Sequence, residues 1–166
     1  MNKIEISADR PDWSRENKKF LAWQPSRSLL ASIRDYQRHT QSRNLWRLFL
    51  KKNAVLRHRF WSVITGADIP LTCQLGGGLL LPHPNGIVIH PDVKIGPNCL
   101  IFQQVTIGVR DGGLPKIGGH VDIGAGAKII GPVTIGDHVR IGANAVVLSD
   151  IPTGKAAVGI PAKIIG

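Results

Sequence analysis

His83 is the residue whose type and setting could do chemistry most directly. It stands between two prolines in the stretch LPHPNGIVI (81–89). The fixed backbone of proline should stiffen this stretch. A neutral imidazole accepts a proton near physiological pH, so His83 is a candidate general base. A surface histidine in a turn is the plain alternative, and the elements around His83 must decide between the two.

A repeat of six residues carries this stretch. Apolar residues recur at that step in three runs: Ile69, Leu75 and Leu81; Ile89, Ile95, Ile101 and Ile107; and Ile117, Ile123, Ile129, Ile135, Ile141 and Val147. Six residues suit one short strand and one corner, and three such units close a triangular coil. Stacked coils bury each other's apolar rows. The sequence therefore predicts an all-β solenoid.

The two cysteines fall on the small-residue positions of this repeat. Cys73 and Cys99 each lie two places before an apolar register residue, and they form no C-x-x-C pair. We expect both to be small buried hydrophobes with free thiols, as in a reducing compartment.

Two slips interrupt the count of six. Leu81 to Ile89 is eight residues and contains His83, and Ile107 to Ile117 is ten and contains the Gly-rich stretch GVRDGGLP. Extra residues in a strict solenoid must bulge outward. The repeat alone leaves two interpretations open: tolerated insertions or functional bulges.

Residues 26–65 predict helices. Asn44 can cap the second helix and Gly66 can end it, whereas the segment before, with Pro11 and Pro25, should be irregular or loosely attached. Apolar residues recur at spacings of three and four, which indicates an apolar face. They are Leu29, Leu30, Ile33, Tyr36, Leu45, Leu48, Phe49, Leu56, Phe60 and Ile64.

The formal charge of +10 is concentrated in this front part. Residues 1–66 hold fourteen Lys or Arg against five Asp or Glu, and residues 67–166 hold seven against six. Such a front could attract nucleic acid or an anionic membrane. We favour a solvated helix face, with Trp46 and Trp61 capping the open end of the coil, and we predict no nucleic-acid partner.

Three segments follow from these patterns. We assign residues 1–66 to a basic helical segment, 67–155 to the solenoid and 156–166 to a C-terminal tail. The chain has no run of about eighteen uncharged apolar residues and no secretory signal at its start. We therefore expect a cytoplasmic protein without a transmembrane segment.

The repeat resembles the hexapeptide acyltransferases, and within them the serine acetyltransferases. The shared stretches are ADIP, HPNGIVI, IFQQVTIG, PKIGGHVDIGAGAKIIGPVTIGDHVRIGANAVV and VGIPAKIIG, over about residues 66–166. The resemblance implies a left-handed parallel β-helix that acts as a homotrimer. It also implies O-acetyl transfer from acetyl-CoA, bound between neighbouring coils, without a metal.

The resemblance assigns roles to particular residues. His83 matches the catalytic base of the family, and Asp68 matches the aspartate that steadies it. Fifteen residues separate the two; with a bulge, this spacing can put Asp68 one rung below His83, because a regular coil has eighteen. Coenzyme contacts carry onto Ala125, Gly126, Ala143, Ser149 and Lys163, and acceptor contacts onto Gln103 and, as a substitute, Arg110.

The acceptor site is where the chain departs from the family pattern. Serine acetyltransferases carry Asp before the catalytic histidine and an Arg-His pair at the end of the loop. This chain has Pro82 and Leu114 there, with Arg110 as the substitute cation. A site for serine needs one counter-charge for the ammonium and one for the carboxylate of the amino acid, because an unpaired buried ion is costly. L-serine is our first acceptor hypothesis and a saccharide hydroxyl, as in surface polysaccharides, is the second.

A zinc enzyme similar to the gamma-class carbonic anhydrases is the alternative of another class. That family binds zinc through three histidines between subunits of a similar β-helix. Here His83 and His120 are 37 residues apart, and Asp122 stands where a third imidazole is wanted. Such a ligand set is unconvincing for zinc, and we predict no metal.

Overall fold

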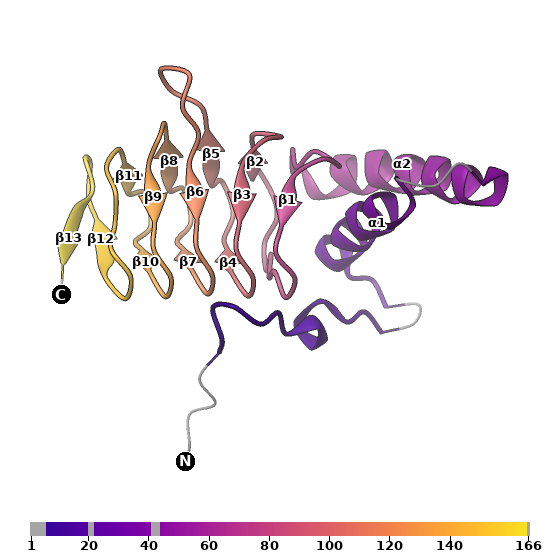
Figure 1. Cartoon of the computed structure of the whole chain (residues 1–166), viewed down its shortest axis with the longest axis horizontal. Helices are drawn as coiled ribbons and strands as arrows, with labels where there is room; N and C mark the ends of the chain where they lie inside the picture. Colours follow the sequence, from indigo (N-terminus) through magenta and orange to yellow (C-terminus); the bar gives the residue numbers. More distant parts are fainter. Residues whose placement is uncertain (1–5, 20–21, 41–43, 166) are drawn as a thin grey trace, which may run out of the picture.

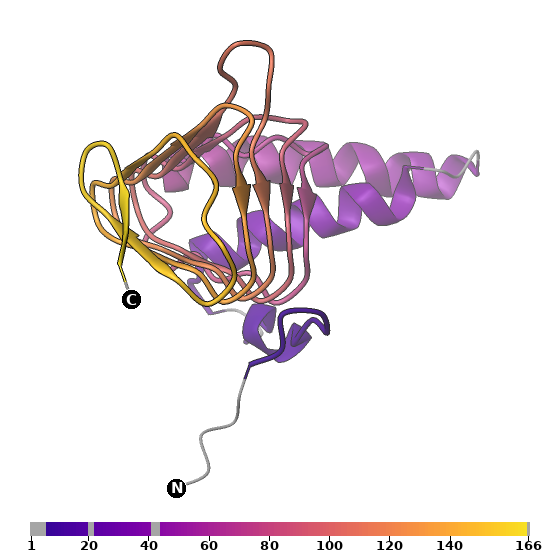
Figure 2. The same ribbon diagram turned by 60° about the vertical axis from the view of Figure 1, so that its left-hand side comes forward.

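Three parallel sheets form the sides of a β-solenoid with two helices at its N-terminal end (Figure 1). The computed structural model describes residues 6–19, 22–40 and 44–165. Figure 2 shows the coils stacked one behind another. The predicted solenoid is confirmed; its left hand and the boundaries after residues 66 and 155 stay predictions.

Each sheet collects one side of the triangle from successive coils. The first contains β1 (Gln74–Leu75), β3 (Lys94–Ile95), β6 (Lys116–Ile117) and β9 (Thr134–Ile135). The second contains β4 (Leu100–Ile101), β7 (Asp122–Ile123), β10 (Arg140–Ile141), β12 (Ala156–Val158) and β13 (Lys163–Ile165). The third contains β2 (Val88–Ile89), β5 (Thr106–Gly108), β8 (Lys128–Ile130) and β11 (Val146–Val147). Of these pairings only β12 with β13 is antiparallel.

The six-residue repeat determines which residues pair between strands of stacked coils. Ile89, Ile107 and Ile129 are partners on consecutive strands of the third sheet, and all three are buried. The small-residue rows are also inside. Cys73 and Cys99 are free and fully buried, as predicted. Burial raises the pKa of the Cys73 thiol to about 12 and that of Cys99 to about 11, so both stay protonated.

The second slip forms a hairpin that projects from the solenoid between β5 and β6 (Figure 1). Arg110 and Gly113 exchange backbone hydrogen bonds of 3.1 and 2.9 Å. Asp111 and Gly112 between them have φ of 52° and 73°. Positive φ at both central positions is the geometry of a two-residue type I′ turn, for which Asp-Gly is a preferred sequence.

The two helices begin and end close to where the sequence predicts. They are α1 (Pro25–His39) and α2 (Leu45–Thr65). The Asn44 side chain accepts the Trp46 N–H at 2.9 Å, and Gly66 ends α2 with φ of 63°. Both capping predictions are confirmed. On α1, Leu29, Leu30 and Ile33 are buried and join the core of the solenoid.

The apolar face of α2 does not pack as the helical spacing suggests. Ala54 and Thr65 are its buried residues, whereas Leu45, Phe49, Leu56 and Phe60 are exposed. Ala54, Thr65 and the partly buried Trp61 lie on the covered side of the helix, whereas the exposed apolar residues face outward. The predicted capping role is wrong for Trp46, which is 65% exposed, whereas Trp61 packs against the core.

The segment before α1 is irregular, as predicted, but it is firmly attached. It contains one 3₁₀ turn, η1 (Trp13–Glu16). Buried Asn98 accepts the Asp12 N–H at 2.8 Å, and its Nδ2 donates to the carbonyls of Ser7 and Arg10 at 2.7 and 2.8 Å. One corner of the solenoid therefore holds the segment, and the expectation of loose attachment is wrong for these residues.

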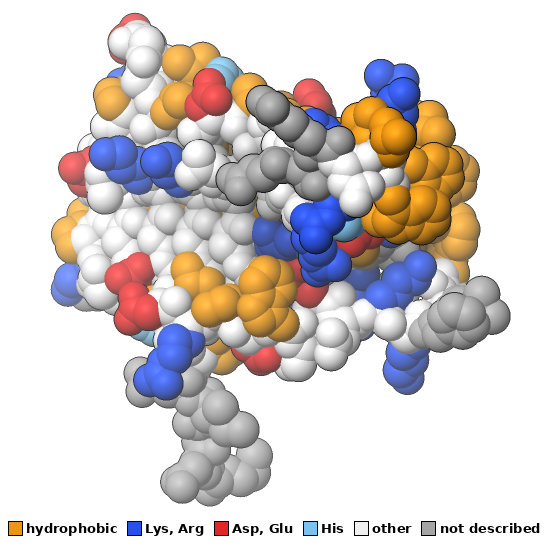
Figure 3. All heavy atoms as spheres, turned by 45° about the vertical axis from the view of Figure 1, so that its right-hand side comes forward, with side chains coloured by type: hydrophobic (Ala, Val, Ile, Leu, Met, Phe, Trp, Pro, Cys, Tyr) orange, Lys and Arg blue, Asp and Glu red, His pale blue; other side chains and the backbone are white. Residues whose placement is uncertain are grey.

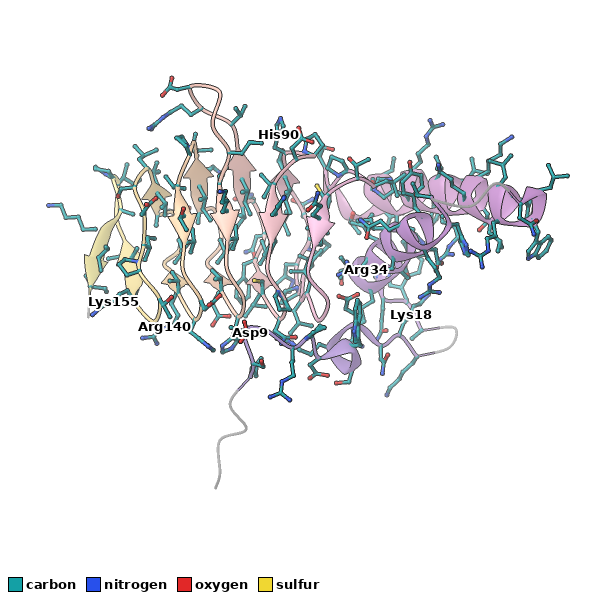
Figure 4. The ribbon with its side chains drawn as sticks, in the orientation of Figure 1. Asp9, Lys18, Arg34, His90, Arg140 and Lys155 are labelled. Carbon is teal, nitrogen blue, oxygen red and sulfur yellow. The ribbon has the colours of Figure 1, made fainter. Side chains whose placement is uncertain are left out.

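Arg34 joins α1, η1 and the first coil, and Figure 4 shows it lying between α1 and that coil. Its guanidinium pairs with Glu16 at 2.9 Å and donates to the carbonyls of Leu75 and Gly76. Glu16 in turn accepts the Leu79 N–H at 3.1 Å. The helical front is thus fixed to the end of the solenoid where the His83 slip lies.

Candidate active site

Asp68 begins a row of outward-facing residues on the third sheet. Its N–H donates to the Ile87 carbonyl at 2.8 Å, and its carbonyl accepts the Ile89 N–H at 3.0 Å. The register of the bridge and strands continues the row up the solenoid: Asp68, Val88, Thr106, Lys128 and Val146. The exposed Asp68 side chain therefore lies one rung before the strand that follows His83.

The first slip forms a bulge, residues 82–86, that rests on the end of α2. The Gly86 N–H donates to the Gly66 carbonyl at 2.8 Å. At Gly66, φ is 63° and an added Cβ would lie 2.7 Å from Asn85 Nδ2, so a side chain would strain the backbone and push on the bulge. Gly66 thus ends α2, leads the chain to Asp68 and supports the segment that carries His83.

The side chains of His83 and Asp68 are both exposed, and Asp68 is bridged to Val88, five residues after His83. Within residues 6–19, 22–40 and 44–165, no hydrogen bond joins the two side chains. Hydrogen bonds between catalytic groups often form only when substrate is bound. The imidazole of His83 and the carboxylate of Asp68 are thus both open to solvent in the first coil.

A cavity of about 350 Å³ opens beside His83, between the bulge and the helices. This volume is near the lower end for small-molecule sites. Its walls are formed by Pro25, Ser26, Ile64, Thr65, Pro82, His83, Pro84 and Asn85. The sequence did not predict that the helices form part of the wall of this cavity. Pro25 and Ser26 are nearly sixty residues from His83, and no motif links the two segments.

Four predicted residues lie along one corner row that starts at the bulge. Three rungs define this row: Gln104 N–H to Asn85 carbonyl (2.9 Å), Gly126 N–H to Gln103 carbonyl (2.8 Å) and Asn144 N–H to Ala125 carbonyl (2.8 Å). Gln103, Ala125, Gly126 and Ala143 therefore border the third sheet on the side of His83.

Among the described residues of this corner row, one polar side-chain atom has no hydrogen-bond partner and one glycine has no room for a side chain. The Gln103 Oε1 is buried and has no hydrogen-bond partner among the described residues, so it can accept a bond from a bound hydroxyl or amine. Gly126 has φ of 73°, and a Cβ there would come within 2.1 Å of the Asn144 Oδ1.

The other predicted residues lie apart from this row. Arg110 and Ser149 follow β5 and β11 on the opposite border of the third sheet, and the Arg110 guanidinium pairs with Asp111 at 3.2 Å. Lys163 is exposed on β13, next to Ala162, whose N–H donates to the Val146 carbonyl at 2.8 Å. Arg110 and Ser149 thus border the third sheet on the side opposite the corner row, whereas Lys163 belongs to the second sheet.

Histidines near the later coils are engaged with each other. The Nδ1 atoms of His120 and His138, on consecutive coils, lie 2.8 Å apart. In the part of the chain that the structure describes, no three His, Cys, Asp or Glu side chains gather as a metal-binding group. The set considered for zinc, His83 with His120 and Asp122, is not brought together.

The comparison with protein families defines the class of this chain. The family model for bacterial transferase hexapeptide (six repeats) matches residues 115–149, which cover β6 to β11. Together with the six-residue register of the whole solenoid, this match makes the chain a hexapeptide-repeat protein.

Within this class, the chain is similar to serine acetyltransferases. Serine acetyltransferase 5 of Arabidopsis thaliana is 42% identical over 134 residues, which are 78% of this chain and 43% of that protein. The serine acetyltransferase of Helicobacter pylori strain J99 is 37% identical over 106 residues, 61% of this chain and 62% of that protein. The chain thus spans less than two thirds of the length of either relative.

Solved structures give the same result over a larger part of the chain. A serine acetyltransferase in complex with CoA superposes with a TM-score of 0.71 at 34% identity, covering 87% of this chain and 59% of that one. The Neisseria gonorrhoeae serine acetyltransferase in complex with serine has a TM-score of 0.72 at 33% identity, covering 88% and 59%. Coverage of 87% takes in more than the solenoid, so part of the helical front is shared.

Proposed function

We propose that this chain is an acetyl-CoA-dependent O-acetyltransferase whose acceptor is the hydroxyl of L-serine. The observation that carries the proposal is the bulge of residues 82–86, which exposes His83 and is bonded to Gly66 through Gly86, while Asp68 pairs with Val88 in the strand that follows the bulge. The similarity to serine acetyltransferases, including one solved with CoA and one with serine, supports it.

In this proposal His83 is the general base. Its imidazole removes the hydroxyl proton as the hydroxyl oxygen attacks the thioester carbonyl, and the imidazolium then returns that proton to the departing thiolate of CoA. Asp68 holds the imidazole tautomer and stabilises the imidazolium. Gln103, with its unpartnered Oε1, positions the acceptor.

The corner row suits a long coenzyme. Ala125, Gly126 and Ala143 have little or no side chain, which leaves the backbone open to close approach of the pantetheine arm. Ser149 and Lys163 lie further along the solenoid, and the exposed Lys163 ammonium can meet a phosphate as a point charge.

We also propose that the active form is a homotrimer in the cytoplasm. His83, Asp68 and the outward row of the third sheet are exposed in a single chain, so a neighbouring solenoid can close the groove. The free thiols of Cys73 and Cys99 are consistent with a reducing compartment. Light scattering measures the assembly, and a monomeric active enzyme would contradict the trimer.

Release of the CoA thiol, measured with acetyl-CoA and L-serine, tests the proposed activity. We expect His83→Ala to lower kcat by about 10²- to 10⁴-fold, the usual contribution of a general base. His90→Ala, on a corner of the next side of the coil, is the matched control and should keep activity. Equal activity of His83→Ala and the unchanged chain would refute the proposed role.

A saccharide hydroxyl is the second candidate acceptor, and the hairpin loop favours it. Leu114 stands at the family's histidine position and packs against the core, so it offers the acceptor no charge. Arg110 is already paired with Asp111. The same thiol assay with serine, homoserine and a panel of sugars decides between the two acceptors. Turnover with a sugar and none with serine would show that the acceptor is a sugar.

A further inference from the structure

The outward side of α2 carries an apolar stripe, which we define as Leu45, Phe49, Leu56, Phe60 and Val63. Successive members are four, seven, four and three residues apart, so they lie on one side of the helix. Their exposed fractions run from 54% at Phe60 to 82% at Leu45 and Val63. Figure 3 shows the hydrophobic side chains gathered in one patch with Lys and Arg near it.

Such a patch is unusual for an exposed surface. A monomeric protein rarely leaves large contiguous apolar areas in water, and those it does leave mark sites of interaction. The stripe lies on a helix that extends beyond the first coil, away from the C-terminal end of the solenoid (Figure 1). A large flat surface can therefore reach it without meeting the coils.

The charge of α2 indicates what kind of surface this is. The helix contains five cations and no Asp or Glu: Arg47, Lys51, Lys52, Arg57 and Arg59. Among the described residues, Arg57 has a carboxylate partner, Asp35 at 2.8 Å, and Lys51 lies over the Tyr36 ring. Lys52 and Arg59 are exposed, and helical geometry puts them along one edge of the stripe.

A second copy of this helix would bring its own Lys52 and Arg59 against those of the first, and like charges oppose such a contact. Nucleic acid would match the cations but has no groove for a flat stripe of Phe and Leu. An anionic lipid surface matches both features, because apolar side chains enter the acyl boundary while Lys and Arg meet the head groups.

We propose that α2 is a peripheral membrane-binding helix that lies flat on an anionic lipid surface. No helix within the described residues is long and apolar enough to cross a membrane, which agrees with a helix that lies on the surface. Ile64, beside the stripe, also lines the cavity that holds His83. The proposed acetyl-transfer site is therefore at the end of the molecule nearest the lipid.

Sedimentation with vesicles tests this proposal on the full chain. We expect binding to phosphatidylcholine vesicles with about one third phosphatidylglycerol, and little binding to phosphatidylcholine alone. Binding should fall at least about tenfold in 1 M salt, because the Debye length shrinks to about 3 Å. No difference between the two vesicle types would overturn the proposal.

Two pairs of variants separate the apolar and the charged contributions. Phe49→Glu/Phe60→Glu should abolish vesicle binding and keep the activity with soluble acceptors, whereas the control Val109→Glu/Ile160→Glu, at exposed apolar sites elsewhere, should still bind. Lys52→Gln/Arg59→Gln should lose roughly 25-fold in binding, at about fivefold per cation. The control Lys116→Gln/Arg140→Gln removes two exposed cations of the solenoid and should bind as the unchanged chain does.

Three results would contradict the lipid surface as the occupant. The first is equal vesicle binding by all four variants. The second is a smaller assembly of Phe49→Glu/Phe60→Glu in light scattering, which would make the stripe a contact between protein chains. The third is tight binding of a DNA oligonucleotide that persists in Phe49→Glu/Phe60→Glu while vesicle binding is absent.

Discussion

The solenoid and the helical front solve the problem of burying apolar residues in opposite ways. In the solenoid each coil covers the apolar row of the next, so residues such as Ile107 and Ile123 are fully buried within one chain. In the front, α1 is covered by the first coil, but α2 presents its large apolar residues to the outside. The first region completes its core alone, whereas the second leaves an apolar surface that we propose binds an anionic lipid surface.

Charge follows the same division. The solenoid is close to neutral and the front carries nearly the whole excess of positive charge. The predicted catalytic residues lie where the two regions meet, because the His83 bulge is bonded to the glycine that ends α2. The proposed chemistry and the proposed membrane attachment thus belong to different regions that share one boundary.

After the loss of His83, the largest effect should come from the carboxylate at this boundary. Asp68→Asn should lower kcat by about 10²- to 10³-fold, because a neutral amide cannot stabilise the imidazolium of His83. Asp92→Asn, an exposed carboxylate on the solenoid, is the control and should leave kcat unchanged. Steady-state kinetics with acetyl-CoA decides, and an unchanged kcat for Asp68→Asn would remove the carboxylate from the mechanism.

The two ways of burying apolar residues predict a difference in stability. Ile123→Ala, inside the stack, should lower the free energy of unfolding by about 3 kcal/mol because it leaves a cavity. Leu56→Ala, on the exposed stripe, should change it by less than about 0.5 kcal/mol. Urea unfolding followed by circular dichroism measures both. Similar losses for the two variants would mean that the stripe is covered in solution.

One buried amide, Asn98, holds the N-terminal segment to a corner of the solenoid. Asn98→Ala removes three hydrogen bonds to the N-terminal segment and should cost about 2 kcal/mol, with faster proteolysis near Ser7 to Arg10. Asn144 has the same corner geometry, with φ of 56° against 61° at Asn98. Asn144→Ala therefore measures only the free-energy cost of placing alanine at a positive φ. Equal effects of the two substitutions would show that the segment is not held by Asn98.

The smallest expected effect concerns the rate at which the two cysteine thiols react with a thiol reagent. Because burial raises the pKa of Cys73 to about 12 and of Cys99 to about 11, neither forms much thiolate at pH 8. We expect slow reaction with a thiol reagent in the folded protein and fast reaction after unfolding. The folded rate should rise as the pH is raised toward these values. Rapid labelling of the native chain at pH 8 would contradict the buried setting.

The sequence predicts the solenoid well because its signal is periodic. The step of six residues, the two slips, the Asn44 cap and the Gly66 stop all depend on local chemistry that a single chain displays. Contacts between distant segments are different. Nothing marks Asn98 as the residue that holds Ser7 and Arg10, since a corner asparagine with positive φ is equally suited to being solvated.

The site was predictable only in part, for a related reason. The spacing of fifteen residues between Asp68 and His83 is visible in the sequence, but the cavity wall from Ser26 and Ile64 depends on how the helices dock. The outward face of α2 was missed because helical spacing shows that apolar residues share a side and not which side is covered.

A structure with CoA and L-serine bound tests the central claim, that the interrupted winding presents His83 to the acceptor. We predict the His83 imidazole within about 3 Å of the serine hydroxyl, with the CoA thiol end on the corner row of Gln103, Ala125 and Ala143. Serine bound elsewhere, with the His83 ring turned away from both ligands, would contradict the account.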